Sequence, residues 1–231
     1  MKEQKKLLRE IVYSRLKSRI VIGKLPMGSK LSENSIASEL GVSKSPVRDA
    51  IQMLERDGLV TVKQQSGTFV VKPSKEQLKE ILEHRHAIET ACLRYCDRDF
   101  LPDLGQELAG IVEQMEFSIE QNNTALFYLL DHQFHEKIVA AAGNRLLVKS
   151  YELSNTLMAA ILNQYGLSDE YVLKAYKEHQ LIANFLINSD LEGAITILDD
   201  HLNVERNIYY GYQFKEFLNH VGVNLPDQDK L

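Results

Sequence analysis

Apolar residues recur at helical spacing along most of the chain, and one short region between residues 59 and 72 interrupts this pattern. The spacing over residues 5–22 predicts a first helix. Ser32 and Ser43 stand where the N-caps of two further helices are expected, and Gly41 separates these helices as a stop. The first part of the chain is therefore predicted to contain three helices.

The region that interrupts the helical pattern is rich in β-branched residues. Two runs, LVTVKQQ and TFVVK, flank Ser66 and Gly67. Such runs around a Gly-containing turn are typical of a β-hairpin. Three helices followed by a hairpin is the element order of a winged helix-turn-helix domain.

Helical period returns after Pro73-Ser74 and continues to about residue 219. The fold class is therefore expected to be mainly α: a winged helix-turn-helix of three helices and a β-hairpin, followed by an all-α helical bundle. Breaks at LPDLG, QNN, AAGN, YGLSD and INSD predict six helices, near residues 75–97, 102–121, 123–141, 145–164, 169–188 and 190–218. The expected domains are a winged helix-turn-helix domain at 1–72, a linker at 73–76, a helical domain at 77–220 and a tail at 221–231.

Net charge has opposite signs in the two parts of the chain. Residues 1–72 hold 14 Lys and Arg against 7 Asp and Glu, a net charge of +7. Residues 73–231 hold 13 against 25, a net charge of −12, and all seven histidines. This division indicates two domains with different partners. Charge alone leaves nucleic acid, anionic lipid and an acidic protein open as the partner of the first.

Composition argues against a membrane or disulfide-rich protein. Apolar runs reach only about six residues, whereas a helix that crosses a bilayer needs roughly 20. The N-terminal stretch MKEQKKLLRE has no apolar segment of a secretory signal. Cys92 and Cys96 lie four apart in a helical pattern, where buried free thiols fit better than metal ligands. We expect a cytoplasmic protein with no membrane partner.

The third predicted helix carries basic residues in its opening turns. A helix-turn-helix inserts the first residues of its second helix into the major groove of DNA. The polar residues at this position are Ser43, Lys44, Ser45 and Arg48. An Arg can hold guanine O6 and N7 with two parallel hydrogen bonds. Taken alone, the basic pair could equally be a solvated face, with the Arg bonded to Asp49 or Gln52.

The first part of the chain resembles the winged-helix domain of GntR-type bacterial transcription regulators. The similar segments are IVIGKLPMGSKL, IASELGVSKSPVRDAIQMLERDGLV and the hairpin ending SGTFV. The resemblance implies that Ser66 and Gly67 form the tip of the wing and that the four polar residues above contact DNA. Lys44 stands where the family usually has Arg, and Asn34 stands where many members have a basic residue. The operator sequence therefore stays open.

Histidines and carboxylates are the informative residues of the helical part. Asp131 and His135 are four residues apart and share a helical face, and His179 and His201 lie in later helices. Three imidazoles and a carboxylate can hold a divalent transition metal such as Zn²⁺ or Ni²⁺. The spacing is too loose to be a motif, so satisfied core or surface histidines fit it as well.

The helical part resembles the FCD domain of the FadR branch of GntR-type regulators. The similar features include Asp-x-x-x-His, an EHxxI-like segment, a later His-Leu pair, and the flanking stretches AAGN and NSDLEGAI. This resemblance implies that Asp131, His135, His179 and His201 are metal ligands.

The same resemblance implies that Arg85 faces the cavity and binds the carboxylate of an effector, as a bidentate donor can. The alternative is an ordinary ion pair with Glu89, four residues later. Asn155, or the metal itself, would supply a second contact, because the predicted helix 145–164 has no basic residue after Lys149. His84 and His86 have no role that the resemblance supplies and are expected at the surface.

The expected function is that of a homodimeric transcription regulator, usually a repressor in such families, and not of an enzyme. Its winged domains would bind a pseudo-palindromic operator in double-stranded DNA. Its helical domain would hold a divalent metal and sense a small organic or sugar acid, a carboxylate effector. Three alternatives stay open: the metal itself as the signal, a purely structural metal, and a metal-dependent hydrolase. The chain has no HExxH motif to support the last.

Overall fold

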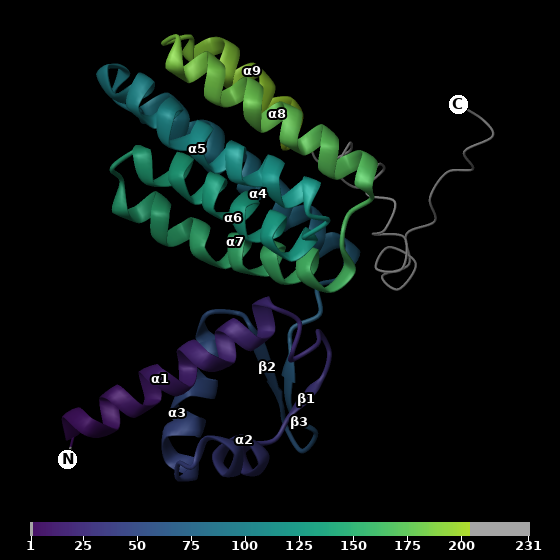
Figure 1. Cartoon of the computed structure of the whole chain (residues 1–231). Coiled ribbons are helices and arrows are strands. Elements are labelled where there is room, and N and C mark those ends of the chain that lie inside the picture. Colours follow the sequence, from purple (N-terminus) through teal and green to yellow (C-terminus); the bar gives the residue numbers. More distant parts are fainter. Residues whose placement is uncertain (1, 204–231) are drawn as a thin grey trace. The chain divides into compact units, whose positions relative to one another are not determined.

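The computed structural model describes residues 2–203, and the chain divides into a first unit, residues 1–73, and a second unit, residues 74–231 (Figure 1). The three helices and the hairpin predicted for the first unit are present. A short strand before the second helix is additional. The elements of the first unit are α1 (Lys2–Val21), β1 (Lys30–Leu31), α2 (Glu33–Leu40), α3 (Lys44–Arg56), β2 (Val60–Lys63) and β3 (Gly67–Val70).

The sheet of the first unit has three antiparallel strands in the order β1-β3-β2. The predicted hairpin is β2 and β3, with Val60 opposite Val70. The additional strand β1 pairs Lys30 with Phe69 on the other edge of β3. Residues Lys30–Leu31 are too few for an alternating pattern, which is why the sequence did not predict this strand.

The core of the first unit lies where α1 packs on α3. Leu16 of α1 and Val47 and Leu54 of α3 are fully buried. Full burial of a large aliphatic side chain is worth about 1.5–3 kcal/mol. Pro46 lies in the first turn of α3, where the missing N–H costs no intrahelical hydrogen bond. The opening of α3 is therefore held by its apolar face, while its polar face stays in solvent.

The described part of the second unit, residues 74–203, contains six helices near the predicted places, one of them preceded by a short 3₁₀ turn. α4 begins with a capping box, in which the Ser74 side chain accepts from the Gln77 N–H and the Gln77 side chain accepts from the Ser74 N–H. The elements are α4 (Lys75–Tyr95), η1 (Arg98–Phe100), α5 (Leu101–Glu120), α6 (Thr124–Ala141), α7 (Arg145–Tyr165), α8 (Asp169–Ile187) and α9 (Leu191–His201).

The prediction of a continuous last helix over residues 190–218 was wrong. α9 ends at His201, and Leu202 lies in a turn. Asn203 follows, and Asn is a residue type that commonly ends helices. The remainder of that predicted helix and the predicted tail at 221–231 lie outside the described residues.

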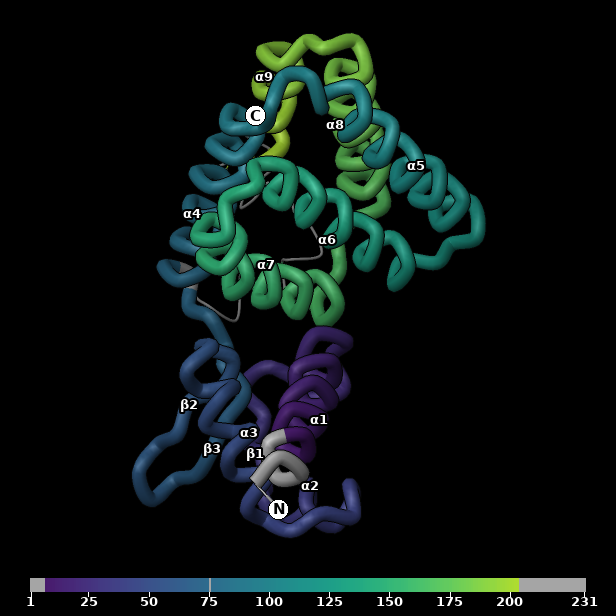
Figure 2. Tube along the Cα trace, turned by 90° about the vertical axis from the view of Figure 1, so that its left-hand side faces the viewer, coloured from purple at the N-terminus to yellow at the C-terminus, as the bar shows by residue number. Residues whose placement is uncertain are grey.

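The helices of the second unit form a closed ring of neighbours. In the order α4, α7, α6, α5, α8 and α9, each helix packs against the next, and α9 returns to α4 (Figures 1 and 2). At Gly105 of α5 an added Cβ would lie 2.5 Å from the Ile187 backbone nitrogen of α8, so these helices meet backbone to backbone. Within residues 2–203, no helix has both the length and the apolar character that crossing a bilayer requires.

Candidate functional site

The predicted DNA-contacting residues lie together on one exposed face of the first unit. Pro46 and Val47 are buried, so the opening of α3 turns its polar side chains outward. The residues on this exposed face are Ser43, Lys44, Ser45 and Arg48. Ser43 occupies the N-cap position as predicted, but its side chain makes no capping hydrogen bond.

Arg48 is paired with Glu33, a residue that the sequence did not suggest. Its Nε and Nη2 donate to the two carboxylate oxygens of Glu33 on α2, at 3.3 and 3.0 Å. The hydrogen bond and the charge of Glu33 raise the pKa of Arg48 above its ordinary value. The pair uses the side-on edge of the guanidinium, which runs from Nε to Nη2. Glu33 does not cover the end-on edge, which runs from Nη1 to Nη2.

The hairpin turn places Ser66 at an exposed tip and Gly67 at the start of β3. Gly67 has a φ of 114°, and an added Cβ would lie 2.7 Å from the Lys30 side chain. Lys30 and Lys63 both lie over the Phe69 ring, with their ammonium groups 5.8 and 5.5 Å from its centroid. The hairpin therefore presents a small basic surface beside its turn.

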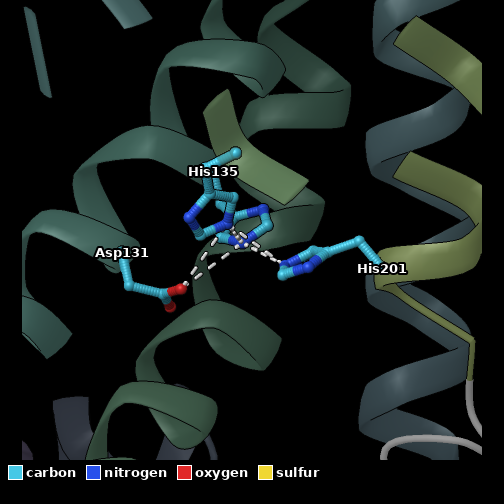
Figure 3. Close-up of side chains that lie close together, drawn as sticks. Asp131, His135 and His201 are labelled. Atoms are coloured by element: carbon cyan, nitrogen blue, oxygen red, sulfur yellow. Dashed lines mark hydrogen bonds and ion pairs between the residues drawn. The ribbon is translucent and has the colours of Figure 1, made fainter. Parts of the chain in front are cut away.

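In the second unit, four side chains from three helices converge on one point. Asp131 and His135 come from α6, His179 from α8 and His201 from α9, and one ligand atom of each lies within 4.8 Å of the others. The three imidazole Nε2 atoms are 3.2–3.4 Å apart. The Asp131 Oδ1 atom lies 3.8 Å from His135 Nε2 and 3.7 Å from His179 Nε2. Figure 3 shows Asp131 and His135 facing His201 across this point.

These distances fit a metal ion. Zn²⁺ lies about 2.0–2.1 Å from imidazole nitrogens, so neighbouring ligands of a tetrahedral ion are about 3.3–3.4 Å apart. The three nitrogens already have this separation, and the Asp131 oxygen is only slightly farther away. His179 is fully buried, and burial, with His201 and His135 beside it, lowers its pKa well below the ordinary value. A neutral imidazole is the form that binds metals.

Two glutamates hold the outer nitrogens of this cluster. His135 Nδ1 is 2.5 Å from Glu89 Oε2, and His201 Nδ1 is 2.9 Å from Glu178 Oε2. An ionised carboxylate only accepts hydrogen bonds, so each Nδ1 carries the hydrogen and each Nε2 presents a lone pair to the cluster. Burial opposes the charge on Glu89, but His135 and the Arg85 guanidinium outweigh it and lower its pKa to about 2.

Arg85 makes the ion pair with Glu89 that was the alternative to effector binding, and it also lines a cavity. Its Nε donates to Glu89 Oε1 at 2.9 Å in a buried position. The cavity is also lined by Asp131, His135 and His201, and its volume of about 40 Å³ is room for about three water molecules. Among the described residues, no group bonds Arg85 Nη2 or the buried amide nitrogen of Asn155.

The sequence-based reasoning missed the part that Glu89, Tyr151 and Glu178 play. The signal for the first lies in α4, where one stripe of buried positions at three-four spacing continues to the residue after the helix. Arg85 and Glu89 are in phase with this stripe, and charged residues in phase with a core stripe are rarely buried without a partner. The residues of the stripe are Leu78, Leu82, Arg85, Glu89, Cys92 and Cys96.

The other described histidines and the two cysteines lie outside the cluster. His84, expected at the surface, is half-buried, and its ring nitrogens bond Ser154 and Ser150 on α7. His86 pairs with Asp199 at 3.0 Å, with 40% of its side chain exposed. Both cysteines are buried and free, as predicted.

Comparison with known families assigns both parts of the chain. The model of bacterial regulatory proteins of the gntR family matches residues 8–70. The FCD domain model matches residues 80–204, which is more than half of the chain. These matches agree with both resemblances drawn from the sequence.

Three relatives carry the names of bacterial transcriptional repressors. The chain is 28% identical to the gluconate operon transcriptional repressor of Bacillus licheniformis, over 65% of this chain and 62% of that protein. It is 33% identical to the repressor of the same name from Bacillus subtilis (strain 168), over 54% and 51%. The match therefore spans half to three fifths of these relatives. It is 29% identical to the probable D-xylose utilization operon transcriptional repressor of Paenarthrobacter nicotinovorans, over 86% and 88%.

Two solved structures share the fold. A putative transcriptional regulator GntR from Rhodococcus sp. RHA1 has a TM-score of 0.77 at 20% identity, over 87% of this chain and 96% of that one. The E. coli McbR/YncC structure has a TM-score of 0.76 at 22% identity, over 91% and 98%. At these identities the likeness concerns the fold alone.

Proposed function

We propose that this chain, which belongs to the GntR family of bacterial regulatory proteins and carries an FCD domain, is a transcription repressor controlled by a metal-dependent acid sensor. The observation that supports the sensor is the convergence of three imidazole nitrogens and a carboxylate beside a cavity that Arg85, Asp131, His135 and His201 line. The protein would act as a homodimer, because two-fold symmetry presents two recognition helices to a pseudo-palindromic operator.

Operator binding is proposed for the exposed face of α3 and for the hairpin. Lys44 and Arg48 would reach base edges and phosphates, while Ser43 and Ser45 and the helix N-terminus would bind phosphate oxygens. Ser66 and Gly67 would approach the adjacent backbone or minor groove. Exposure of the polar residues on α3 beside buried Pro46 and Val47 supports this assignment.

The metal is proposed to be Zn²⁺ or Ni²⁺, held by Asp131, His135, His179 and His201. Imidazole suits both ions, and three nitrogens with one carboxylate fill a tetrahedral site, so an effector oxygen would bind by raising the coordination number of the ion to five or six. A bound ion would supply Lewis-acid positions for a carboxylate or hydroxyl oxygen of the effector.

The effector is proposed to be a small organic or sugar acid; the cavity of about 40 Å³ admits its carboxylate, and a sugar acid would enter only as the lining side chains move apart. The Arg85 Nη2 and Asn155 Nδ2 atoms are buried donors, and such donors normally have partners. A carboxylate at the cavity would satisfy the guanidinium. The names of the relatives, repressors of a gluconate operon and of a D-xylose utilization operon, support a sugar-derived ligand. The acid changes operator affinity only if it binds two states of the dimer unequally.

The test is thermal unfolding of the purified protein with D-gluconate, D-xylonate, citrate and L-lactate. Each acid is added to Zn²⁺-loaded and Ni²⁺-loaded protein and to protein treated with EDTA. A ligand at 100 times its Kd stabilises the native state by about 2.7 kcal/mol. We expect one acid class to raise the unfolding temperature only when metal is present.

Two variants separate the metal site from general effects. Asp131→Asn removes a ligand charge with little change in volume and should abolish the acid-dependent rise. His132→Ala, on the same helix, changes a histidine that pairs with Glu136 and should keep it. A metal that stabilises the protein when no acid does would contradict the acid sensor. Operator affinity that responds to metal alone would then identify the metal as the signal.

A further inference from the structure

Glu89 is a fully buried charge of the second unit. Its side chain has no exposed surface, and three donors reach its two oxygens. Oε2 accepts from His135 Nδ1, while Oε1 accepts from Arg85 Nε at 2.9 Å and from the Tyr151 hydroxyl at 2.7 Å. The two oxygens of one carboxylate therefore face different parts of the site.

The hydrogen bond at Glu89 Oε2 sets the orientation of the His135 ring. The bond to Nδ1 fixes the ring rotation and the tautomer, so that Nε2 points at the Nε2 atoms of His179 and His201, 3.4 and 3.3 Å away. His201 has the same arrangement with Glu178. In the described part of the chain, His179 Nδ1 has no such partner. Two of the three imidazoles are thus oriented by carboxylates before any ion binds.

The other oxygen, Glu89 Oε1, bonds Arg85 and Tyr151, and neither of these residues is a candidate metal ligand. Tyr151 lies on α7, whereas the four candidate ligands come from α6, α8 and α9. The Tyr151 hydroxyl also lies 3.3 Å from Asn155 Oδ1. Arg85 and Asn155 are the two proposed acid-binding residues, so both contact the same small network.

We propose that Glu89 is a positioning residue that joins the metal and acid halves of the site, orienting His135 through one oxygen and Arg85 with Tyr151 through the other. This inference rests on the proposed metal site and adds that α7 influences the metal without touching it. Loss of the Tyr151 hydroxyl leaves Oε1 with one donor fewer, which changes how the carboxylate holds His135. The geometry of a bound ion then changes although no ligand has been altered.

The experiment uses Co²⁺ as a spectroscopic probe in the full-length protein. Affinity is measured by competition with a chelator, and geometry by the visible absorption band of bound Co²⁺. Glu89→Gln and Glu178→Gln should each weaken Co²⁺ binding by about 10–100-fold, the usual effect of removing an outer-shell carboxylate. Tyr151→Phe should alter the Co²⁺ absorption band and weaken binding by a smaller factor.

The matched control is Tyr176→Phe. This substitution removes a hydroxyl that bonds Glu116 rather than Glu89. It should leave the band and the affinity unchanged. A double variant supplies the decisive comparison, because residues that act through a common partner are not additive. Tyr151→Phe should have no further effect on Co²⁺ in the Glu89→Gln background.

Each outcome decides a different claim. A wild-type protein that binds no Co²⁺, Zn²⁺ or Ni²⁺ would refute the metal site and this inference together. Wild-type binding that Glu89→Gln leaves unchanged would overturn only the role of Glu89. If Glu89→Gln does not fold, Tyr151→Phe decides alone: a Co²⁺ band identical to those of wild type and Tyr176→Phe would overturn the inference.

Discussion

The ion pair between Glu33 and Arg48 leads to a prediction about DNA recognition. Glu33 occupies the side-on edge of the Arg48 guanidinium, so the end-on edge is held in a fixed direction for a second, bidentate contact. A bidentate contact to guanine discriminates against other bases by about 5- to 150-fold. We therefore expect Arg48→Ala to lower operator affinity within that range and to relax specificity at one base position.

The same pair should contribute little to folding. The Arg48 side chain is 60% exposed and that of Glu33 is 32% exposed, and exposed ion pairs are weak in solution. Arg48→Ala should therefore change the unfolding temperature by no more than about 2–4 °C. The loss of DNA binding would then come from the contact and not from the fold.

Two further variants test the orienting role of Glu33. Arg48→Lys keeps the charge but loses the planar fork, so it should retain affinity for unrelated DNA and lose operator preference. Glu33→Gln keeps the size of the side chain but weakens the anchor, and it should lower operator preference in the same direction. If Glu33 merely competed with DNA for Arg48, Glu33→Gln would instead raise operator affinity.

The assay is a fluorescence titration of the DNA upstream of the gene, with scrambled DNA as the reference, at several salt concentrations. Removing a phosphate contact lowers the slope of affinity against salt concentration by about one ion. Removing a base contact instead changes the ratio of the affinities for the operator and for scrambled DNA. An unchanged ratio in Arg48→Ala would refute the assignment of Arg48 to a base.

Three other predictions concern packing and reactivity. Gly105→Ala should lower the free energy of unfolding in urea by about 1–3 kcal/mol, because the new Cβ meets the Ile187 backbone, whereas Gly110→Ala on the same helix meets nothing and should be neutral or stabilising. Gly67→Ala should lower it by about 1–3 kcal/mol through its positive φ, and operator affinity should fall with it. Burial raises the pKa of the Cys92 thiol to about 11, so iodoacetamide should label it about 100-fold more slowly than in urea, as mass spectrometry would show. Equal rates in native and unfolded protein would contradict the burial.

The helices could be predicted because their apolar stripes and stops are local signals. Asp131 and His135 could be paired from sequence because a spacing of four puts them on one helical face. Their meeting with His179 and His201 depends on how the ring of helices closes, and local periodicity carries no information about that. The resemblance to a known domain supplied it.

Other features depend on contacts between separate elements, which a local sequence pattern does not show. Strand β1 has two residues, and its pairing with β3 depends on a partner far along the chain. Arg48 pairs with Glu33 across the turn between two helices, while local spacing favoured Asp49 or Gln52. Glu89 looked like a simple partner at i+4 of Arg85. Its bonds to His135 and Tyr151 come from other helices and required the tertiary structure.

The capping box at the start of α4 fixes where the helix that carries Arg85 begins. Ser74 is the first residue of the second unit, and Arg85 lies ten residues after Lys75 on the same uninterrupted helix. At 1.5 Å per residue, this distance is about 15 Å. The segment that joins the two units is therefore attached to the first end of α4, and a later part of α4 borders the cavity. A tilt of α4 would displace the joining segment directly, because no loop lies between that segment and the helix.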